Sequence, residues 1–152
     1  MSIWDVLTGR QGAADENPDY YSEGMELASQ ERFHEALTSF RLALRESPTD
    51  VATLEQMAIV YTRMGVTDEA VKMYQRALEK DPGSAGAHYG IAFLLLNKGC
   101  GDEAVAHLER FLETGGHLEG TGRHVEHARQ TLDELRAGDE TTEDESTEDD
   151  GD

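Results

Sequence analysis

The histidines are the residues of this sequence whose spacing could serve metal chemistry. His117, His124 and His127 lie close together in the chain. The last two are three residues apart, a spacing that places both on one face of a helix. Glu119 or Glu126 could add a carboxylate ligand. The spacing differs from that of a zinc-protease helix, however, and no cysteine pair accompanies it. A histidine-based metal-binding protein is therefore the alternative interpretation, and we predict no metal site and no cofactor.

Catalytic residues are not legible elsewhere in the sequence. It contains no serine–histidine–acid arrangement, no glycine-rich phosphate loop and no paired catalytic carboxylates. Cys100 lies between two glycines with no base or cation beside it, so its thiol lacks the neighbours that activate a cysteine. His88 stands at a core position, and we expect it to be packed there. We predict a protein that is not an enzyme.

The charge of the chain is strongly negative. Its 152 residues, enough for one domain, include 32 acidic and 13 basic residues, and the formal net charge is -19. Nine of the acids follow Ala137, and residues 1–136 still hold 23 acids against 13 bases, so the excess is global. This favours a halophilic, salt-adapted protein over a mesophilic one with an acidic tail. No basic stripe exists to neutralise phosphates, so we expect no nucleic-acid partner.

Several features favour a cytoplasmic protein that does not enter a membrane. Cys100 is the only cysteine, which leaves no intramolecular disulfide and suits a reducing compartment. The longest apolar run, Ile91–Leu96, is too short to span a bilayer. No basic residue precedes the apolar cluster at the N-terminus, which argues against a secretory signal.

The elements that position these residues form a repeat of 34 residues. Val51–Pro82 has the apolar periodicity of two amphipathic helices joined by a tight turn at Gly65, and the pattern recurs 34 residues to either side. Each helix keeps an apolar stripe that its partner only half covers, so the units must stack on one another. The repeat shows in five columns: Gly24, Ala58 and Ala92; Ala36, Ala70 and Ala104; Phe40, Tyr74 and Leu108; Ala43, Ala77 and Phe111; Pro48, Pro82 and Gly116.

On these columns the chain resembles the tetratricopeptide repeat (TPR) family, from about Asn17 to Gly116. The resemblance is strong in the first two units, and the third departs from it at Phe111 and Gly116, where alanine and proline are expected. It implies an all-α fold, a right-handed helical-hairpin solenoid of three TPR-like repeats. The expected repeats are residues 17–50, 51–84 and 85–118.

Segments with other properties flank the expected repeats. Residues 1–16 combine a short apolar stretch with a linker of small and polar residues. A C-terminal capping helix is expected within residues 119–137, with Val125, Ala128, Leu132 and Leu135 on its apolar face. Residues 138–152 are acidic, lack large apolar side chains and are expected to be disordered. Within the repeats we expect helices over residues 19–30, 33–47, 51–64, 68–80, 85–98 and 102–113, and we expect Thr67 to be the N-cap of the helix over residues 68–80.

The resemblance implies that the first helix of each unit lines a concave face that binds peptides or partner helices. Gly86 and Gly90, four residues apart, would leave a notch on this face for a close-lying backbone or side chain. We therefore predict a non-catalytic protein–protein interaction module that binds an apolar or amphipathic peptide or helix in its concave groove. The predicted partner-binding residues are Tyr21, Met25, Ile59, Arg63, Gly86, Tyr89, Gly90, Phe93, Leu96 and Asn97.

Two other occupants of the groove remain open from the sequence. The apolar side chains of Ile3, Trp4 and Leu7 could cover it in cis, or a second copy of the chain could do so as a homodimer. Some relatives grip a C-terminal carboxylate with basic and amide side chains on this face. That clamp is absent here apart from Gln56, so we do not predict binding of that type.

Overall fold

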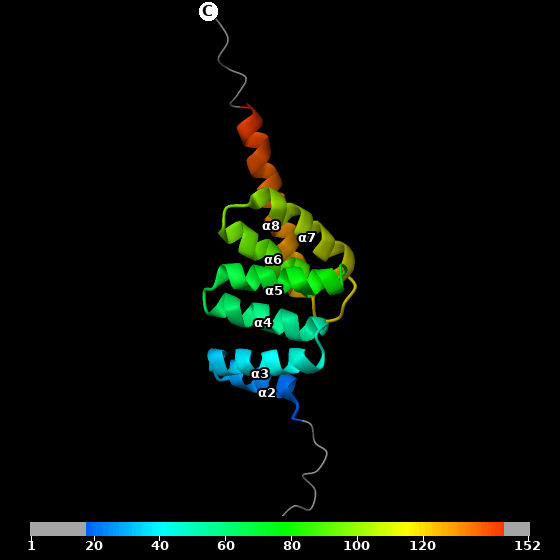
Figure 1. Cartoon of the computed structure of the whole chain (residues 1–152). Coiled ribbons are helices and arrows are strands. Elements are labelled where there is room, and N and C mark those ends of the chain that lie inside the picture. The colour runs from blue at the N-terminus through cyan, green and yellow to red at the C-terminus, as the bar shows by residue number, and fades with distance from the viewer. Residues whose placement is uncertain (1–17, 145–152) are drawn as a thin grey trace, which may run out of the picture. The chain divides into compact units, whose positions relative to one another are not determined.

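The computed structural model describes residues 18–144, and all the regular structure in this range is helical. The chain divides into two compact units, Met1–Pro48 and Thr49–Asp152. Within the described range the first unit contains two helices and the second contains five (Figure 1). In chain order they are α2 (Tyr20–Ser29), α3 (Phe33–Glu46), α4 (Val51–Arg63), α5 (Thr67–Lys80), α6 (Ala85–Asn97), α7 (Gly101–Gly115) and α8 (Gly122–Asp144).

The first unit is a helical hairpin in which an aromatic ring of one helix packs against a glycine of the other. Gly24 on α2 is buried, and a Cβ added there would lie 2.6 Å from Cε1 of Phe40 on α3. Only glycine therefore lets the two helices approach this closely. Asp19 begins α2 as its N-cap, because its carboxylate accepts a hydrogen bond from the Ser22 backbone N–H at 3.0 Å.

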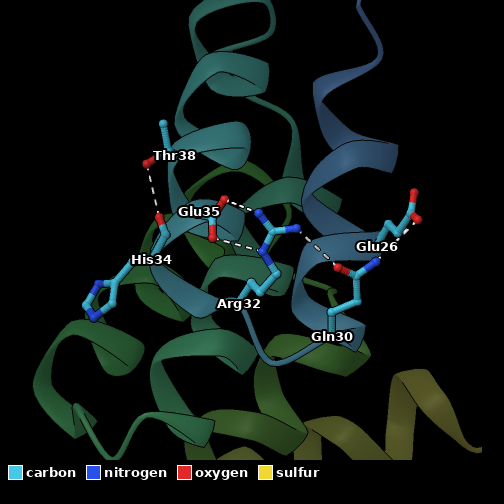
Figure 2. Close-up of polar contacts among 6 residues, drawn as sticks. All are labelled: Glu26, Gln30, Arg32, His34, Glu35 and Thr38. Carbon is cyan, nitrogen blue, oxygen red and sulfur yellow. Dashed lines mark hydrogen bonds and ion pairs between the residues drawn. The ribbon is translucent and has the colours of Figure 1, made fainter.

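The turn between α2 and α3 is held by polar side chains, as Figure 2 shows. Glu31 adopts a left-handed conformation with φ 61°, which costs a residue with a Cβ about 1–2 kcal/mol. Arg32 follows it and donates from Nε to Oε1 of Glu35 at 2.9 Å and from Nη1 to Oε1 of Gln30 at 3.3 Å. These bonds tie the end of α2 to the first turn of α3.

The same turn recurs twice in the second unit, but with glycine. Gly65 and Gly99 have φ of 76° and 78°, and each lies 34 residues from its counterpart. In both turns the next residue donates its backbone N–H back into the preceding helix, Val66 to Tyr61 and Cys100 to Leu95, each at 2.9 Å. The 34-residue period thus repeats a backbone geometry as well as an apolar pattern.

The helices of the second unit begin with different caps. Asp50 and Ser84 cap α4 and α6 by accepting from the backbone N–H groups of Thr53 and Ala87. Thr67 was expected to be an N-cap, but that expectation is wrong, since α5 already includes Thr67 and its capping position is Val66, which makes no side-chain cap bond. Small residues pack between the helices and are fully buried: Ala58, Ala70, Ala77, Ala92 and Ala104.

The last helix covers the apolar side of the preceding hairpin. Val125, Ala128 and Leu132 of α8 are buried against Leu108 and Phe111 of α7. The expected apolar face of the C-terminal helix is therefore present. Burial of each large side chain stabilises the unit by about 1.5–3 kcal/mol.

The end of α8 differs from the expected range of 119–137. The helix begins at Gly122, inside that range, after a turn in which Gly120 has φ 81°. It ends at Asp144, so residues 138–144, which were expected to be disordered, are helical. Residues 138–144 contain no proline, and Gly138 is their only glycine, so the segment contains no residue that stops a helix. The remaining expectations for residues 1–17 and 145–152 lie outside the described residues.

No helix in the described range is both long enough and apolar enough to cross a membrane.

Candidate functional site

A pocket of about 510 Å3 opens in the second unit. Its walls come mainly from α6, and further lining residues come from α4, α5, α7, the connection between α7 and α8, and the start of α8. No lysine, arginine, aspartate or glutamate lines it. The lining residues are Ile59, Thr62, Tyr74, Ala85, Gly86, Tyr89, Gly90, Phe93, Leu94, Asn97, Phe111, Leu118, Thr121 and His124.

Tyr89 is the centre of an aromatic wall in this pocket. Its ring centroid lies 4.7 Å from Phe93 and 4.9 Å from both Phe111 and His124, the last meeting it edge-on. The Tyr89 hydroxyl is 2.9 Å from Nδ1 of His127, and burial raises the pKa of this phenol. Such tilted and edge-on arrangements are those that aromatic rings prefer, so the wall is fixed by its own contacts.

His127 completes the wall from its outer side. Its ring stacks on Phe93 at a centroid distance of 4.6 Å and an interplanar angle of 9°. The first turns of α8 thus hold the aromatic residues of α6 in place.

The side of α6 that faces α5 has a close fit at Gly90. A Cβ at this position would lie 2.3 Å from Cζ of Tyr74, so the tyrosine ring occupies the space a side chain would need. The expectation of an open notch at Gly90 is corrected here, because the chain's own Tyr74 fills it. Tyr74 is buried, which together with the nearby charge of Glu55 raises the pKa of its phenol to about 12.

Gly86 lies at the other end of the pocket beside a carboxylate. A Cβ at Gly86 would be 3.1 Å from Oε2 of Glu55 on α4, and the other oxygen, Oε1, accepts a hydrogen bond from the Ser84 hydroxyl. Ser84 also caps α6, so one serine fixes both the start of the helix and the carboxylate above it. Gly86 is exposed and lines the pocket, and Glu55 is half-buried, so its carboxylate lies beside the pocket and not in its lining.

The rims of the pocket carry exposed apolar side chains. Ile59 on α4 is 39% exposed, and Leu118 in the connection before α8 is 54% exposed. Among the described residues, large apolar side chains this exposed are few, and these two line one pocket. Exposed apolar surface around a cavity of this size is typical of a binding site.

Six of the ten predicted partner-binding residues line this pocket. They are Ile59, Gly86, Tyr89, Gly90, Phe93 and Asn97. Arg63 and Leu96 belong to the same two helices but do not line it, and Leu96 is half-buried. Tyr21 and Met25 lie on α2 in the first unit, where Met25 is exposed and Tyr21 packs near Phe40.

Several pocket residues were not predicted from the sequence. Tyr74 and Phe111 come from the second helix of their hairpins, and Leu118, Thr121 and His124 come from the connection to α8 and its first turn. The pairing of a large aromatic residue at position 74 with a glycine at position 90 was a usable signal, since glycine inside a helix needs a steric reason. For the connection we find no sequence signal.

His88 and His107 pack against each other, with ring centroids 5.2 Å apart. Nε2–H of His88 donates to the Pro82 carbonyl at 2.8 Å, and its Nδ1 therefore accepts from Nδ1–H of His107 at 3.0 Å. His88 is 7% exposed, so it is packed as expected. Burial, and next the neighbouring His88, lower the pKa of His107, while Glu103 opposes that shift.

Metal binding by the histidines finds no geometric support in the described part of the chain. The rings of His124 and His127 pack against Tyr89 and Phe93, respectively. Between residues 18 and 144, no three histidine, cysteine or acidic side chains are grouped so that they could hold a metal ion. Cys100 is a half-buried free thiol in the turn before α7.

Comparison with known proteins gives one family match and several similar structures. Residues 63–116 match the family model described as "Tetratricopeptide repeat". The type III secretion chaperone SycD of Yersinia enterocolitica, in complex with a peptide of the translocator YopD, is similar with a TM-score of 0.74. The identity is 18%, over 79% of this chain and 92% of that one. No curated protein matches the chain by sequence.

Two further solved structures are similar. The Sgt2 TPR domain from Aspergillus fumigatus has a TM-score of 0.68 at 18% identity, over 88% of this chain and 85% of that one. MamA has a TM-score of 0.61 at 25% identity, over 64% of this chain and 57% of that one. These likenesses, together with the family match, confirm the resemblance stated from the sequence and the all-α helical-repeat fold that it implied.

Proposed function

We propose that this chain, whose residues 63–116 match the tetratricopeptide repeat model, is a non-catalytic module that binds an apolar or amphipathic peptide segment of another protein. The binding site is the pocket of the second unit. The observation that carries the proposal is an open pocket with an aromatic wall, exposed apolar rims and no lysine, arginine, aspartate or glutamate in its lining. The similar structure of SycD, which holds a peptide, supports a peptide as the class of ligand.

The walls of the pocket favour a helical ligand. They are built mainly from helices, whose backbone N–H and C=O groups bond within each helix and leave none for pairing with a strand. An extended peptide bound there would bury backbone N–H and C=O groups without hydrogen-bond partners, which would weaken its binding. An amphipathic helix satisfies its backbone internally and presents only side chains, so it suits Ile59, Phe93 and Leu118.

A matched pair of variants tests the site. Ile59 lines the pocket and is 39% exposed, whereas Val66 is 38% exposed and does not line it. A randomised phage library of peptides of about twelve residues, long enough for three helical turns, is selected against the wild-type chain. Enriched peptides are then titrated by fluorescence anisotropy. Ile59→Asp should weaken their binding at least about tenfold, because it buries a charge against an apolar ligand, and Val66→Asp should leave it unchanged.

Other occupants of the pocket give other results. Equal binding to wild type and Ile59→Asp would place the ligand elsewhere and contradict the proposal. A homodimer that uses this pocket would dissociate in Ile59→Asp, as seen by sedimentation velocity, and would contradict it in favour of self-association. Cis cover by residues 1–9 would show as tighter peptide binding after deletion of those residues.

We also propose a salt-rich, reducing cytoplasm as the setting of the protein, without a nucleic-acid or membrane partner. The support is compositional: the acid excess extends through the repeats, lysine is scarce, and the lone cysteine leaves no intramolecular disulfide.

A further inference from the structure

Glu55 is a charged group beside an otherwise apolar pocket. It shares a face of α4 with Ile59, four residues on, which lines the pocket. Its Oε2 lies over Gly86, a second lining residue, at 3.1 Å from the place of a Cβ there. A ligand seated between Ile59 and Gly86 would therefore pass next to this carboxylate.

Only part of the hydrogen-bonding capacity of this carboxylate is used. Ser84 donates one hydrogen bond to Oε1, whereas a carboxylate can accept about four. The ion pairs between described side chains join other acids, and Glu55 is in none of them. The charge is nevertheless held in one place, because Ser84 is buried and itself fixed as the cap of α6.

A ligand in the pocket that covers Glu55 also desolvates its carboxylate. Removing water from an unpaired carboxylate is costly, and the cost is offset only by an opposite charge or by good hydrogen-bond donors. A purely apolar ligand would thus lose part of the affinity gained at the aromatic wall. An arginine or lysine one helical turn from the apolar anchor would instead meet Oε2.

We infer that the pocket selects peptides in which a basic residue stands beside the apolar anchor, and that Glu55 is the residue that recognises it. The inference rests on the proposed function and adds the chemistry of the partner: a basic amphipathic helix. It is the opposite of recognition of a C-terminal carboxylate, for which the pocket has no lysine or arginine in its lining.

The test is a double-mutant cycle on the peptides enriched from the phage library. Glu55→Gln removes the charge and keeps an oxygen that accepts from Ser84, so the fold should be retained, as circular dichroism checks. Glu79→Gln makes the same change in net charge at an exposed position of α5 outside the pocket. Each peptide is compared with a version whose basic residue is replaced by glutamine, on all three proteins.

On wild type and Glu79→Gln, we expect the replacement of the basic residue to weaken binding about fivefold, the upper range for a partly exposed ion pair. On Glu55→Gln the two peptides should bind alike. Added salt should reduce the fivefold difference on wild type. A glutamate in place of the basic residue should weaken binding to wild type further, which keeps the inference testable on the wild-type protein alone.

Two results would overturn the inference while leaving the proposed function intact. One is that the selected peptides bind in a way that depends on Ile59 but show no preference for a basic residue. The other is an equal effect of Glu55→Gln and Glu79→Gln, which would indicate diffuse attraction to an acidic protein. Peptide binding that is insensitive to Ile59→Asp would overturn both proposals at once.

Discussion

At the scale of single residues, the pocket depends on the places where glycine replaces a side chain. Gly90 and Gly86 lie on the same helix and look equivalent in the sequence, but they have different neighbours. Gly90 faces the buried ring of Tyr74, and Gly86 faces the carboxylate of Glu55 at a longer distance. The two positions therefore differ in what an added methyl group would displace.

Gly90→Ala should destabilise the protein. The new Cβ would lie 2.3 Å from Tyr74, and overpacking of this kind costs about 1–3 kcal/mol, partly offset by the better helix propensity of alanine, about 1 kcal/mol. We expect a lower free energy of unfolding in urea. Gly86→Ala is the matched control, since the Glu55 carboxylate can move by a few tenths of an ångström. Equal stability of the two variants would show that Tyr74 does not occupy the space at Gly90.

The His88–His107 pair predicts a pH dependence of stability. The pKa of His107 is lowered in the folded protein. Below about pH 6.5 the unfolded chain therefore binds more protons than the folded chain, and the free energy of unfolding decreases. The contribution of His107 is complete above this range and decreases as pH falls through it. His107→Gln can still donate to Nδ1 of His88 but does not titrate.

The measurement is the difference in free energy of unfolding between wild type and His107→Gln at several pH values. Because the carboxylates titrate in both proteins, their effects cancel in this difference. Wild type should lose stability relative to the variant as pH falls from about 7.5 to about 5.5. A difference that stays constant with pH would contradict the lowered pKa.

At the scale of elements, α8 acts as the cover of the α6–α7 hairpin. Leu132 is 3% exposed and belongs to the cluster with Leu108 and Phe111. Leu132→Ala should cost about 2–5 kcal/mol through lost burial and the cavity it leaves. Arg129→Ala, at an exposed position of the same helix, should change stability by less than about 0.5 kcal/mol. Thermal unfolding of both variants checks this, and a small effect of Leu132→Ala would mean that α8 is not docked.

Most elements could be predicted from the sequence, and the misses have physical reasons. The hairpins follow from the 34-residue columns, because Ala58 and Ala92 must be small where helices touch. The cap of α5 was missed because Thr67 has the right residue type one position too late. The end of α8 was missed because an acidic segment without apolar residues lacks a packing reason to be helical, yet contains nothing that stops a helix already started.

The site could be predicted only in part. Residues on the first helix of a hairpin, such as Ile59 and Phe93, follow from the repeat register. The contributions of Tyr74 and of the connection with Leu118 and Thr121 depend on tertiary packing, which periodicity does not encode. The role of Gly90 was misread for the same reason, since a glycine indicates space without telling what fills it.

At the scale of the whole molecule, the charge of -19 should make stability depend on salt. Like charges repel less as the Debye length shortens from about 10 Å at 0.1 M to about 3 Å at 1 M salt. We expect the Tm to rise over this range of KCl. Potassium chloride is preferred to sulfate, which strengthens apolar burial by itself. A Tm that does not change with KCl would contradict the proposed salt adaptation.

Peptide binding in the pocket of the second unit can be followed at the isoleucine methyl groups. The chain has three isoleucines: Ile59 on the pocket rim, Ile91 in the core, and Ile3 near the N-terminus. Methyl NMR of isoleucine-labelled protein, titrated with a library-selected peptide, thus gives three resolved reporters. If the peptide occupies the pocket, the Ile59 signal should shift in proportion to peptide occupancy, while that of Ile91 should move much less. Saturable binding that leaves the Ile59 signal unchanged would contradict it.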